Sequence, residues 1–251
     1  MAKHKHSQGY ILAGILFLLA LVCVLVKGDI FLNHTLSKDD ALPVRAVKID
    51  GVFRQLSKKK IADVTGRVCA GQNIANLDLN VLKEELQKDP WVAQVAIKKK
   101  MPDTLILSII EHVPAAYWNE DGLYDAKSKS VFYPDLSQFN QPLVKLGAFR
   151  DNLCSEVYDS AVMFIRAMNE TPYQMVALYL DEVRCYNMTL DNGTKLILGR
   201  EPMQALENLK RFIRSFRHSG LSIDEVEYVD LRYDVGFAVG KRQPSTVVDK
   251  K

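Results

Sequence analysis

The chain has 251 residues, with 33 basic and 30 acidic side chains and a formal net charge of +3 at pH 7. Three lysines near the N-terminus, at positions 3, 5 and 27, account for this excess, so residues 28–251 are electrically neutral. A neutral region of this length gives no electrostatic footprint for nucleic acid, and it is long enough for one or two domains with their own cores.

The first predicted element is an apolar run of 17 residues, Tyr10–Val26, without a charge or a proline. As a helix it would be about 26 Å long, close to the roughly 30 Å hydrocarbon layer of a bilayer, and it can extend to Leu32. Basic residues precede it, which places the N-terminus in the cytoplasm. A cleaved signal peptide is the alternative, but the run exceeds the usual apolar core of about 7–15 residues, and no small-residue cleavage site follows. The predicted segments are a cytoplasmic tail (1–9), a transmembrane helix (10–32) and a linker (33–43).

Residues 44–112 are predicted to form a compact α+β unit. Alternation of apolar and polar residues indicates its strands, which are Val44–Asp50, Trp91–Lys98 and Thr104–Glu111. Ser57 can cap a first helix that stops at Gly66, and Asp78 can cap a second helix that ends before Pro90. The order strand, helix, helix, strand, strand predicts a small sheet with both helices on one face.

Residues 113–240 are predicted to form a second, strand-rich domain. Its predicted strands are Tyr117–Trp118, Gly122–Tyr124, Val131–Tyr133, Asn187–Leu190, Lys195–Leu198 and Val226–Val239. Asn192 and Gly193 supply the turn of a hairpin. Two amphipathic helices are expected, one over 153–168 and one from Pro202 to Gly220 with Met203 in its apolar stripe. Residues 241–251 are expected to be a disordered tail.

Cysteines and catalytic motifs give no sign of a reactive site. Cys69, Cys154 and Cys185 are odd in number and widely spaced, so we expect buried free thiols, although one disulfide stays open. The sequence contains no H-E-x-x-H, G-x-S-x-G, C-x-x-C or G-x-G-x-x-G pattern, and Gly236–Lys241 is one residue short of a phosphate-binding loop. We expect no catalytic, cofactor or metal site, which disfavours an envelope hydrolase.

Two basic runs, Lys58–Lys60 and Lys98–Lys100, have two interpretations. They could contact anionic lipid or an acidic partner. The sequence alone favours the other interpretation, in which they are a solvated helix start and a solvated strand end.

The last predicted strand, Val226–Val239, is the remaining candidate for function. A terminal strand often lies at the edge of a sheet, where its free N–H and C=O groups can pair with a partner strand. A partner backbone could approach closely at Val235-Gly236-Phe237, because Gly236 has no side chain. The alternative is an inner strand without an exposed edge.

Several segments together resemble the FtsQ/DivIB family of bacterial cell-division proteins, of the γ-proteobacterial type. LAGILFLLALVCVLV is similar to the family's membrane anchor. VRAVKIDG and DPWVAQVAIKKKMPDTLILSIIEHVPAAYW resemble its POTRA domain and the exit from that domain. LDNGTKLILGR and YVDLRYDVGFAVG resemble two stretches of its β-domain, so the resemblance extends over residues 12–240.

The resemblance implies a non-enzymatic scaffold of the divisome, held by one helix in the bacterial inner membrane at the division septum. It implies a POTRA domain over 44–112 and a mixed, mostly antiparallel β-domain with flanking helices over 113–240. The β-domain would recruit FtsB and FtsL, with FtsB adding a strand to the last strand, and FtsK, FtsW and FtsI are further expected partners. The implied contact residues are Arg184 on a neighbouring strand, and Arg232, Tyr233, Asp234, Val235, Gly236, Phe237 and Ala238.

Some residues depart from the family pattern. Val235, Phe237 and the pair Lys241-Arg242 differ from the residues common in close relatives, which leaves the side-chain pairing with FtsB open. A second function also stays open, that of a POTRA-bearing component of envelope transport or outer-membrane assembly. Such proteins usually carry tandem POTRA repeats, whereas this sequence shows one.

Overall fold

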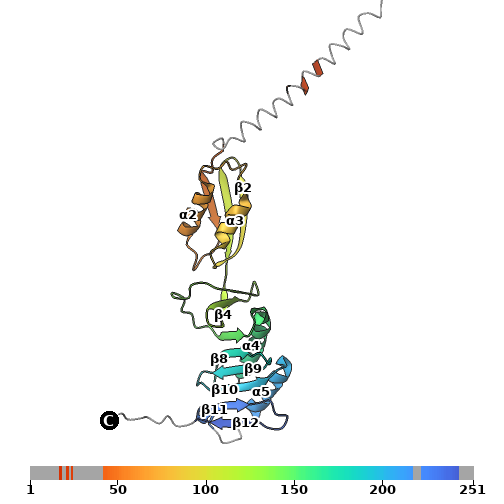
Figure 1. The fold of residues 1–251 in the computed structure, drawn as a ribbon. Coiled ribbons are helices and arrows are strands. Elements are labelled where there is room, and N and C mark those ends of the chain that lie inside the picture. Colours follow the sequence, from red (N-terminus) through yellow and green to blue (C-terminus); the bar gives the residue numbers. More distant parts are fainter. Residues whose placement is uncertain (1–16, 19–20, 23, 25–41, 217–221, 243–251) are drawn as a thin grey trace, which may run out of the picture. The chain divides into compact units, whose positions relative to one another are not determined.

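The structure is a computed structural model, which describes residues 17–18, 21–22, 24, 42–216 and 222–242. The predicted tail over 1–9, and most of the predicted transmembrane helix and linker, lie outside the described residues. Among the residues that are described, no helix is both long and apolar enough to cross a membrane. The chain divides into two compact units, unit 1 (Met1–Glu111) and unit 2 (His112–Lys251), and most of their larger elements are labelled in Figure 1.

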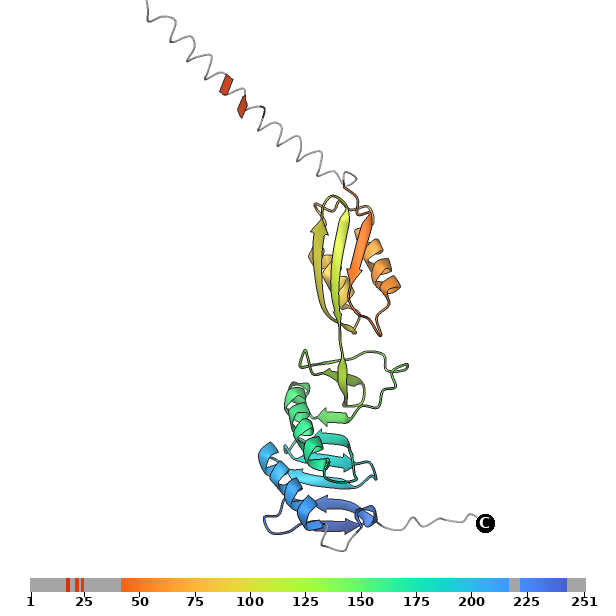
Figure 2. The ribbon, with the colours of Figure 1, turned by 180° about the vertical axis from the view of Figure 1, so that it is seen from behind.

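Unit 1 contains a three-stranded sheet with two helices on one face, behind the sheet in Figure 2. Its elements in chain order are β1 (Ala46–Asp50), α2 (Lys58–Cys69), α3 (Leu79–Gln87), β2 (Val92–Lys100) and β3 (Thr104–Glu111). β3 is the central strand, and it is parallel to β1 and antiparallel to β2. The predicted order of elements is confirmed.

The helices of unit 1 begin as the sequence predicts, but α2 ends later. Asp78 caps α3, because its side chain accepts a hydrogen bond from an N–H of the first turn at 2.8 Å. Ser57 precedes α2 without a capping bond from its side chain. The predicted stop at Gly66 is wrong, since α2 continues to Cys69. A glycine weakens a helix by about 1 kcal/mol without ending it, and the buried side chains of Thr65 and Cys69 keep the last turn on the core.

A buried carboxylate lies at the end of the unit 1 sheet where β3 finishes. Glu111, the last residue of β3, is only 8% exposed. Its two carboxylate oxygens accept the backbone N–H groups of Arg54 and Gln55, each at 2.7 Å. These charge-assisted bonds hold the loop between β1 and α2 over the end of the central strand.

Unit 2 is built on a nine-stranded sheet in the order β12-β11-β10-β9-β8-β7-β4-β5-β6. The strands are β4 (Pro114–Trp118), β5 (Gly122–Asp125), β6 (Ser130–Phe132), β7 (Lys145–Ala148), β8 (Met175–Leu180), β9 (Tyr186–Leu190), β10 (Lys195–Gly199), β11 (Val226–Asp230) and β12 (Ala238–Lys241). Five neighbouring pairs are antiparallel and three are parallel, so the expected mixed, mostly antiparallel sheet is confirmed. The sequence pattern does not predict β7 and β8, because β7 is buried over most of its length and β8 does not alternate strictly.

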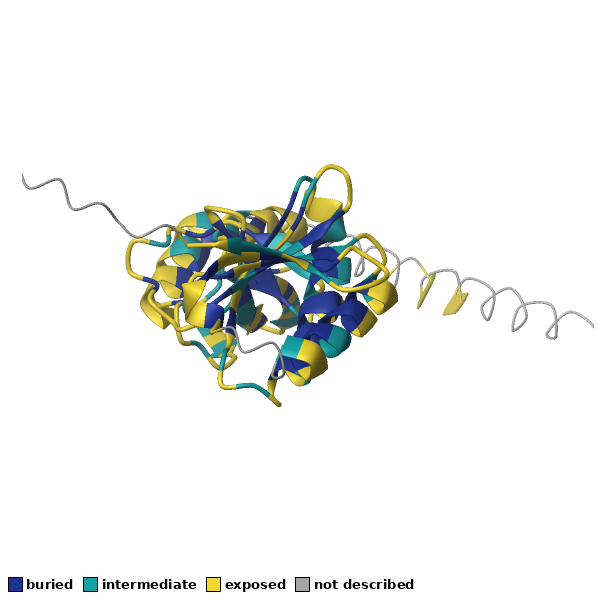
Figure 3. Ribbon diagram, turned by 90° about the horizontal axis from the view of Figure 1, so that it is seen from below, coloured by how far each residue is buried: buried dark blue, intermediate teal, exposed yellow. Residues whose placement is uncertain are grey.

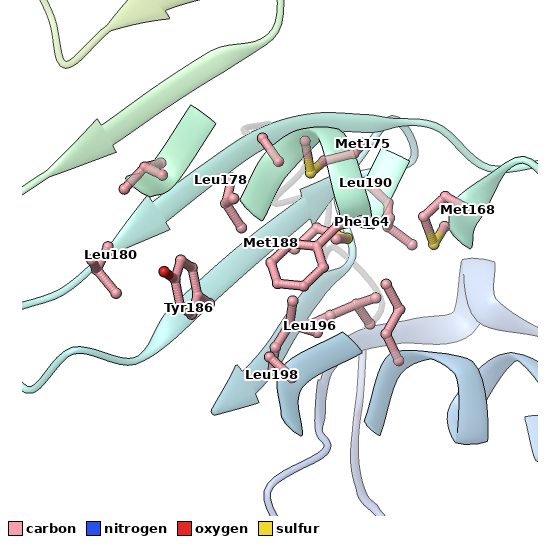
Figure 4. Packing of buried hydrophobic residues seen from close by; sticks show 14 of the residues in the cluster. Phe164, Met168, Met175, Leu178, Leu180, Tyr186, Met188, Leu190, Leu196 and Leu198 are labelled. Atoms are coloured by element: carbon pink, nitrogen blue, oxygen red, sulfur yellow. The ribbon is translucent and has the colours of Figure 1, made fainter. Parts of the chain in front are cut away.

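Two helices, α4 (Cys154–Met168) and α5 (Pro202–Phe216), cover one face of this sheet, and η1 (Asp151–Leu153) and η2 (Ile223–Glu225) are single short turns. Phe164 of α4 lies in the core beside strand residues such as Met188 and Leu190 (Figure 4). Exposed residues gather on the outer sides of the helices (Figure 3). Met203 is 63% exposed, not part of the stripe as predicted. It lies about 120° around the helix from the buried Leu209.

The predicted single strand Val226–Val239 is wrong. It is a hairpin of β11 and β12 joined by a loop over residues 231–237. Leu231 still follows the sheet, since its N–H donates to the carbonyl of Ile197 at 2.9 Å. The chain then turns at Gly236, which has a φ of +90°, a value that glycine adopts without strain. The predicted helix end at Gly220 lies outside the described residues.

Candidate partner-binding edge

The two outer strands of the unit 2 sheet are β6 and β12, and β12 pairs on one side with β11. No other strand in the described part of the chain pairs with its second side. Its residues Ala238, Val239 and Gly240 have small or aliphatic side chains, and only Lys241 is charged. The prediction that the C-terminal strand lies at a sheet edge is therefore confirmed.

The hydrogen bonding of the hairpin shows which backbone groups of β12 are free. Arg242 donates its N–H to the carbonyl of Glu225 at 2.8 Å, toward β11. Backbone groups point alternately to either side of an antiparallel strand. The N–H and C=O groups of Val239 and Lys241 therefore face away from β11. An added strand would find two donors and two acceptors there.

The loop over 231–237 is held to α5 by Arg211. The Arg211 guanidinium donates to the carbonyl oxygen of Tyr233 at 2.6 Å and to that of Asp234 at 2.8 Å. Its Nη2 also donates to Oδ1 of Asn208 at 3.3 Å, and Asn208 donates from Nδ2 to the carbonyl of Leu198 on β10 at 3.1 Å. One polar chain thus connects β10, α5 and the loop before β12.

Phe237 provides an apolar contact at the end of the same loop. Its ring meets Phe212 edge to face, with the ring centroids 5.3 Å apart, and lies 6.3 Å from the ring of Phe216. Edge-to-face contacts of this kind stabilise by about 1 kcal/mol beyond the area that they bury. Phe237, implied by the resemblance as a partner contact, therefore contributes to attaching β12 to unit 2.

Arg232 is paired with Asp230 at the end of β11. Nε and Nη2 of Arg232 donate to Oδ1 and Oδ2 of Asp230 at 2.9 and 2.6 Å, and the Arg232 N–H donates to Oδ1 at 3.1 Å. The bonds from Arg232 hold the pKa of Asp230 below its ordinary value, although burial acts in the opposite direction. The Asp230 side chain is 9% exposed and that of Arg232 is 54% exposed, so the cation is accessible from outside.

The exposed side chains that a partner could contact lie in the loop between Arg232 and Phe237. Tyr233 is 55% exposed and Val235 is 95% exposed, and Asp234 is exposed beside them. A side chain added at Gly236 would find open space, although its positive φ would be strained. Residues 232–237 lie in the loop before β12 and Ala238 is the first residue of that strand, and their contact with a partner stays a prediction.

Arg184 lies at the same end of the sheet as Arg232, since Tyr186 pairs with Gly199 and Ile197 pairs with Asp230, and the thiol of the next residue, Cys185, is close enough to Arg232 to sense its charge. Arg184 lies in the turn between β8 and β9 with a φ of +61°, not on a strand next to β12 as expected, and β10 and β11 intervene in the sheet. Its Nη2 contacts Oε1 of Glu156 on α4 at 2.5 Å. Glu156 also accepts from the hydroxyl of Tyr186 at 3.0 Å, and burial raises the pKa of Tyr186 to about 12. Glu156 thus holds both Arg184 and the buried Tyr186.

The described residues offer no group of three or more His, Cys, Asp or Glu side chains that could hold a metal ion. Cys69, Cys154 and Cys185 are buried and free, as the sequence predicts. Burial raises the pKa values of the Cys69 and Cys185 thiols, which lowers their reactivity.

Sequence reasoning does not find Arg211 or Asn208, because both lie on α5, far along the chain from the strand that they position. One signal for the loop was present. Asp234-Val235-Gly236 is a turn-forming sequence, and an isolated glycine in a strand pattern often marks a break. The continued alternation of apolar and polar residues from Val226 concealed it.

Comparison with known proteins agrees with this architecture. Residues 42–112 match the family model described as "POTRA domain, FtsQ-type", and residues 116–232 match "Cell division protein FtsQ/DivIB, C-terminal". The fold thus belongs to the class in which a POTRA domain is followed by a second, sheet-based domain. Most of the loop over 231–237, and β12 itself, lie beyond the second match.

Relatives of nearly full length give the same result. A protein of Vibrio cholerae named "Cell division protein FtsQ" is 31% identical over 223 residues, which cover 88% of this chain and 84% of that protein. A protein of Escherichia coli with the same name is 28% identical over 242 residues, covering 94% of this chain and 86% of that protein. The chain belongs to the FtsQ/DivIB family of cell-division proteins.

Proposed function

We propose that this protein is a non-enzymatic scaffold of the division septum, anchored in the inner membrane by residues 10–32, with both units on the periplasmic side. Its role is to recruit the FtsB–FtsL pair. FtsB adds a strand to the free side of β12, and side chains of the neighbouring loop contact the pair. FtsK, FtsW and FtsI are further partners of the same assembly.

The observation that carries the proposal is the free side of β12. Main-chain hydrogen bonds give affinity in strand addition, and exposed side chains beside the strand give specificity. Tyr233 supplies apolar area at this edge, and the half-exposed Arg232 supplies a charge-assisted contact. Arg184, in the turn before β9 at the same end of the sheet as Arg232, is a further proposed contact.

A matched pair of variants at Val239 tests the backbone contact. Val239→Pro removes an N–H that faces the added strand, whereas Val239→Ala shortens the same side chain and keeps that N–H. We expect the proline variant of the full chain in detergent to bind FtsB–FtsL at least about tenfold more weakly than the alanine variant, a difference of ~1.4 kcal/mol. Titration calorimetry measures it, and equal affinities of the two variants would exclude strand addition at β12.

The side-chain contact is tested by Tyr233→Ala, with Tyr179→Ala as the control. Both tyrosines are about half exposed, but Tyr179 lies on β8, away from the edge. An exposed aromatic that becomes a binding hot spot contributes about 2 kcal/mol, so Tyr233→Ala should weaken binding about thirtyfold. The same loss in the Tyr179 variant would mean that the contact lies on the sheet face and not at the edge.

A further inference from the structure

The end of unit 1 at which the chain enters carries a group of basic residues. Lys100 at the end of β2 and Ala46 at the start of β1 both pair with Thr104, so the β2–β3 turn and the entering chain lie at the same end of the sheet. At the same end, the backbone N–H of Ile74 donates to the carbonyl oxygen of Leu42 at 2.9 Å. We call this end, formed by residues 42–46, 70–78 and 98–104, the entry end of unit 1.

The charge of the entry end is unbalanced. Its basic residues are Arg45, Lys98, Lys99 and Lys100, and its acidic residues are Asp78 and Asp103. The Asp78 carboxylate caps α3, and that of Asp103 accepts the hydroxyl hydrogen bond of Thr104 at 3.0 Å.

The cations of the entry end are mostly free. Lys99 reaches the carbonyl of Ala75 at 2.9 Å. Arg45, Lys98 and Lys100 are exposed, and within the described residues none of them forms an ion pair. The entry end therefore presents unneutralised positive charge to its surroundings.

An exposed apolar side chain completes this surface. Met101 is 53% exposed at the tip of the β2–β3 turn, directly after the lysines. The other basic run has a different setting, since Lys60 is paired with Asp89 at 2.7 Å at the opposite end of the sheet. Lysines around an exposed apolar tip are typical of segments that contact a membrane interface, where the cations meet phosphate groups and the apolar group enters the head-group layer.

We infer that the entry end of unit 1 binds the surface of anionic phospholipids in the membrane that holds the chain. The inference rests on the membrane anchor of the proposed function, but not on the binding of FtsB–FtsL. Nine residues, and so ten Cα–Cα steps, separate Leu32, the end of the predicted anchor, from Leu42. They span at most about 35 Å, so the basic tip is always within reach of the bilayer surface. Each basic residue near such a surface strengthens binding about fivefold.

Hydrogen exchange of the full chain in lipid nanodiscs tests this contact. Discs of phosphatidylcholine are compared with discs that contain equal parts of phosphatidylcholine and phosphatidylglycerol. We expect the backbone amides of residues 99–101 and 103 to exchange at least about fivefold more slowly in the anionic discs. This difference should vanish at roughly 0.5 M salt, where the Debye length falls to a few ångström.

Two charge-matched variants separate the entry end from a general charge effect. Lys98→Ala combined with Lys100→Ala should abolish the slowing. Lys58→Ala combined with Lys59→Ala, at the opposite end of the sheet, should preserve it. Unchanged exchange of the buried Leu105 and Leu107 amides shows that each variant is folded. Unchanged affinity for FtsB–FtsL in the first variant keeps this test separate from that of the edge.

Three results would overturn the inference. Equal exchange rates in the two disc types would indicate that the basic tip binds an acidic protein partner and not anionic lipid. Loss of the slowing in the Lys58 and Lys59 variant would show a non-specific effect of net charge. Slowing by inorganic phosphate in phosphatidylcholine discs, equal to that by anionic lipid, would indicate a site for single anions and not a membrane surface.

Discussion

One outer strand of each unit, β2 in unit 1 and β12 in unit 2, differs clearly from the other in the side chains that it exposes. β2 of unit 1 is an outer strand of nine residues that finishes in three consecutive lysines. β12 of unit 2 has four residues, and three of them are Ala, Val and Gly. Lysines on an edge strand discourage the addition of another strand, whereas small side chains permit it. The comparison indicates that strand addition is suppressed at β2 and permitted at β12.

The largest expected effect concerns unit 1 alone. Glu111→Ala removes the acceptor of two 2.7 Å hydrogen bonds and leaves the N–H groups of Arg54 and Gln55 without it. We expect a loss of about 3 kcal/mol in the stability of unit 1, measured by hydrogen exchange of the β3 amides. If β12 is the binding edge, the affinity for FtsB–FtsL stays the same. A parallel loss of affinity would assign part of the binding to unit 1.

A smaller effect is expected when a lysine, which discourages strand addition at β2, is introduced into β12. Ala238→Lys places a lysine on the exposed first residue of the edge, with Ala238→Ser as a control of similar size to the original residue. We expect the lysine variant to bind FtsB–FtsL about tenfold more weakly, a difference of ~1.4 kcal/mol, while the serine variant binds normally. Normal binding of the lysine variant would show that small side chains are not what makes this edge receptive.

The smallest expected effect is a dependence on pH at the same edge. The pKa of Asp230 is lowered by Arg232 in the folded protein, so the pair stabilises unit 2 above about pH 4, the ordinary pKa of an aspartate, and this contribution is lost as the pH falls through the lowered value. Because Arg232 is half exposed, we expect about 1 kcal/mol or less.

Asp230→Asn should remove that part of the acid sensitivity. In a Trp91→Phe background, the fluorescence of the buried Trp118 reports the unfolding of unit 2 alone, since the chain has two tryptophans. The measurement compares the stability of the two proteins at pH 6 and about pH 3. Identical acid sensitivity of both proteins would mean that other carboxylates, such as Asp125 and Asp151, are responsible.

The sequence predicts well where local signals and packing agree. Thr104–Glu111 is a strand with the predicted bounds, Asp78 caps its helix, and Gly193 with a φ of +84° closes the predicted hairpin. It predicts poorly where distant residues decide. The break after Asp230 depends on contacts with Arg211 and Phe212 of α5, which no pattern within Val226–Val239 contains.

The same holds for the candidate site. The edge position of the last strand was predictable, since chain termini often form edges and an alternating strand was evident. The placement of Arg184 was not, because the number of strands between two segments depends on the order of the whole sheet. β7 and β8, which contribute to that order, lack a clear strand pattern in the sequence.

The attachment of the β11–β12 hairpin has a consequence for the rate and cost of association. Arg211 fixes the loop before β12, and the Arg242 guanidinium, which donates to the carbonyl of Asn192 at 3.0 Å, fixes the residue after it. A strand restrained at both ends is already in the shape that its partner requires. It loses little conformational entropy when the complex forms, so more of the gross interaction energy appears as affinity. The entropic cost of ordering then falls mainly on the incoming segment.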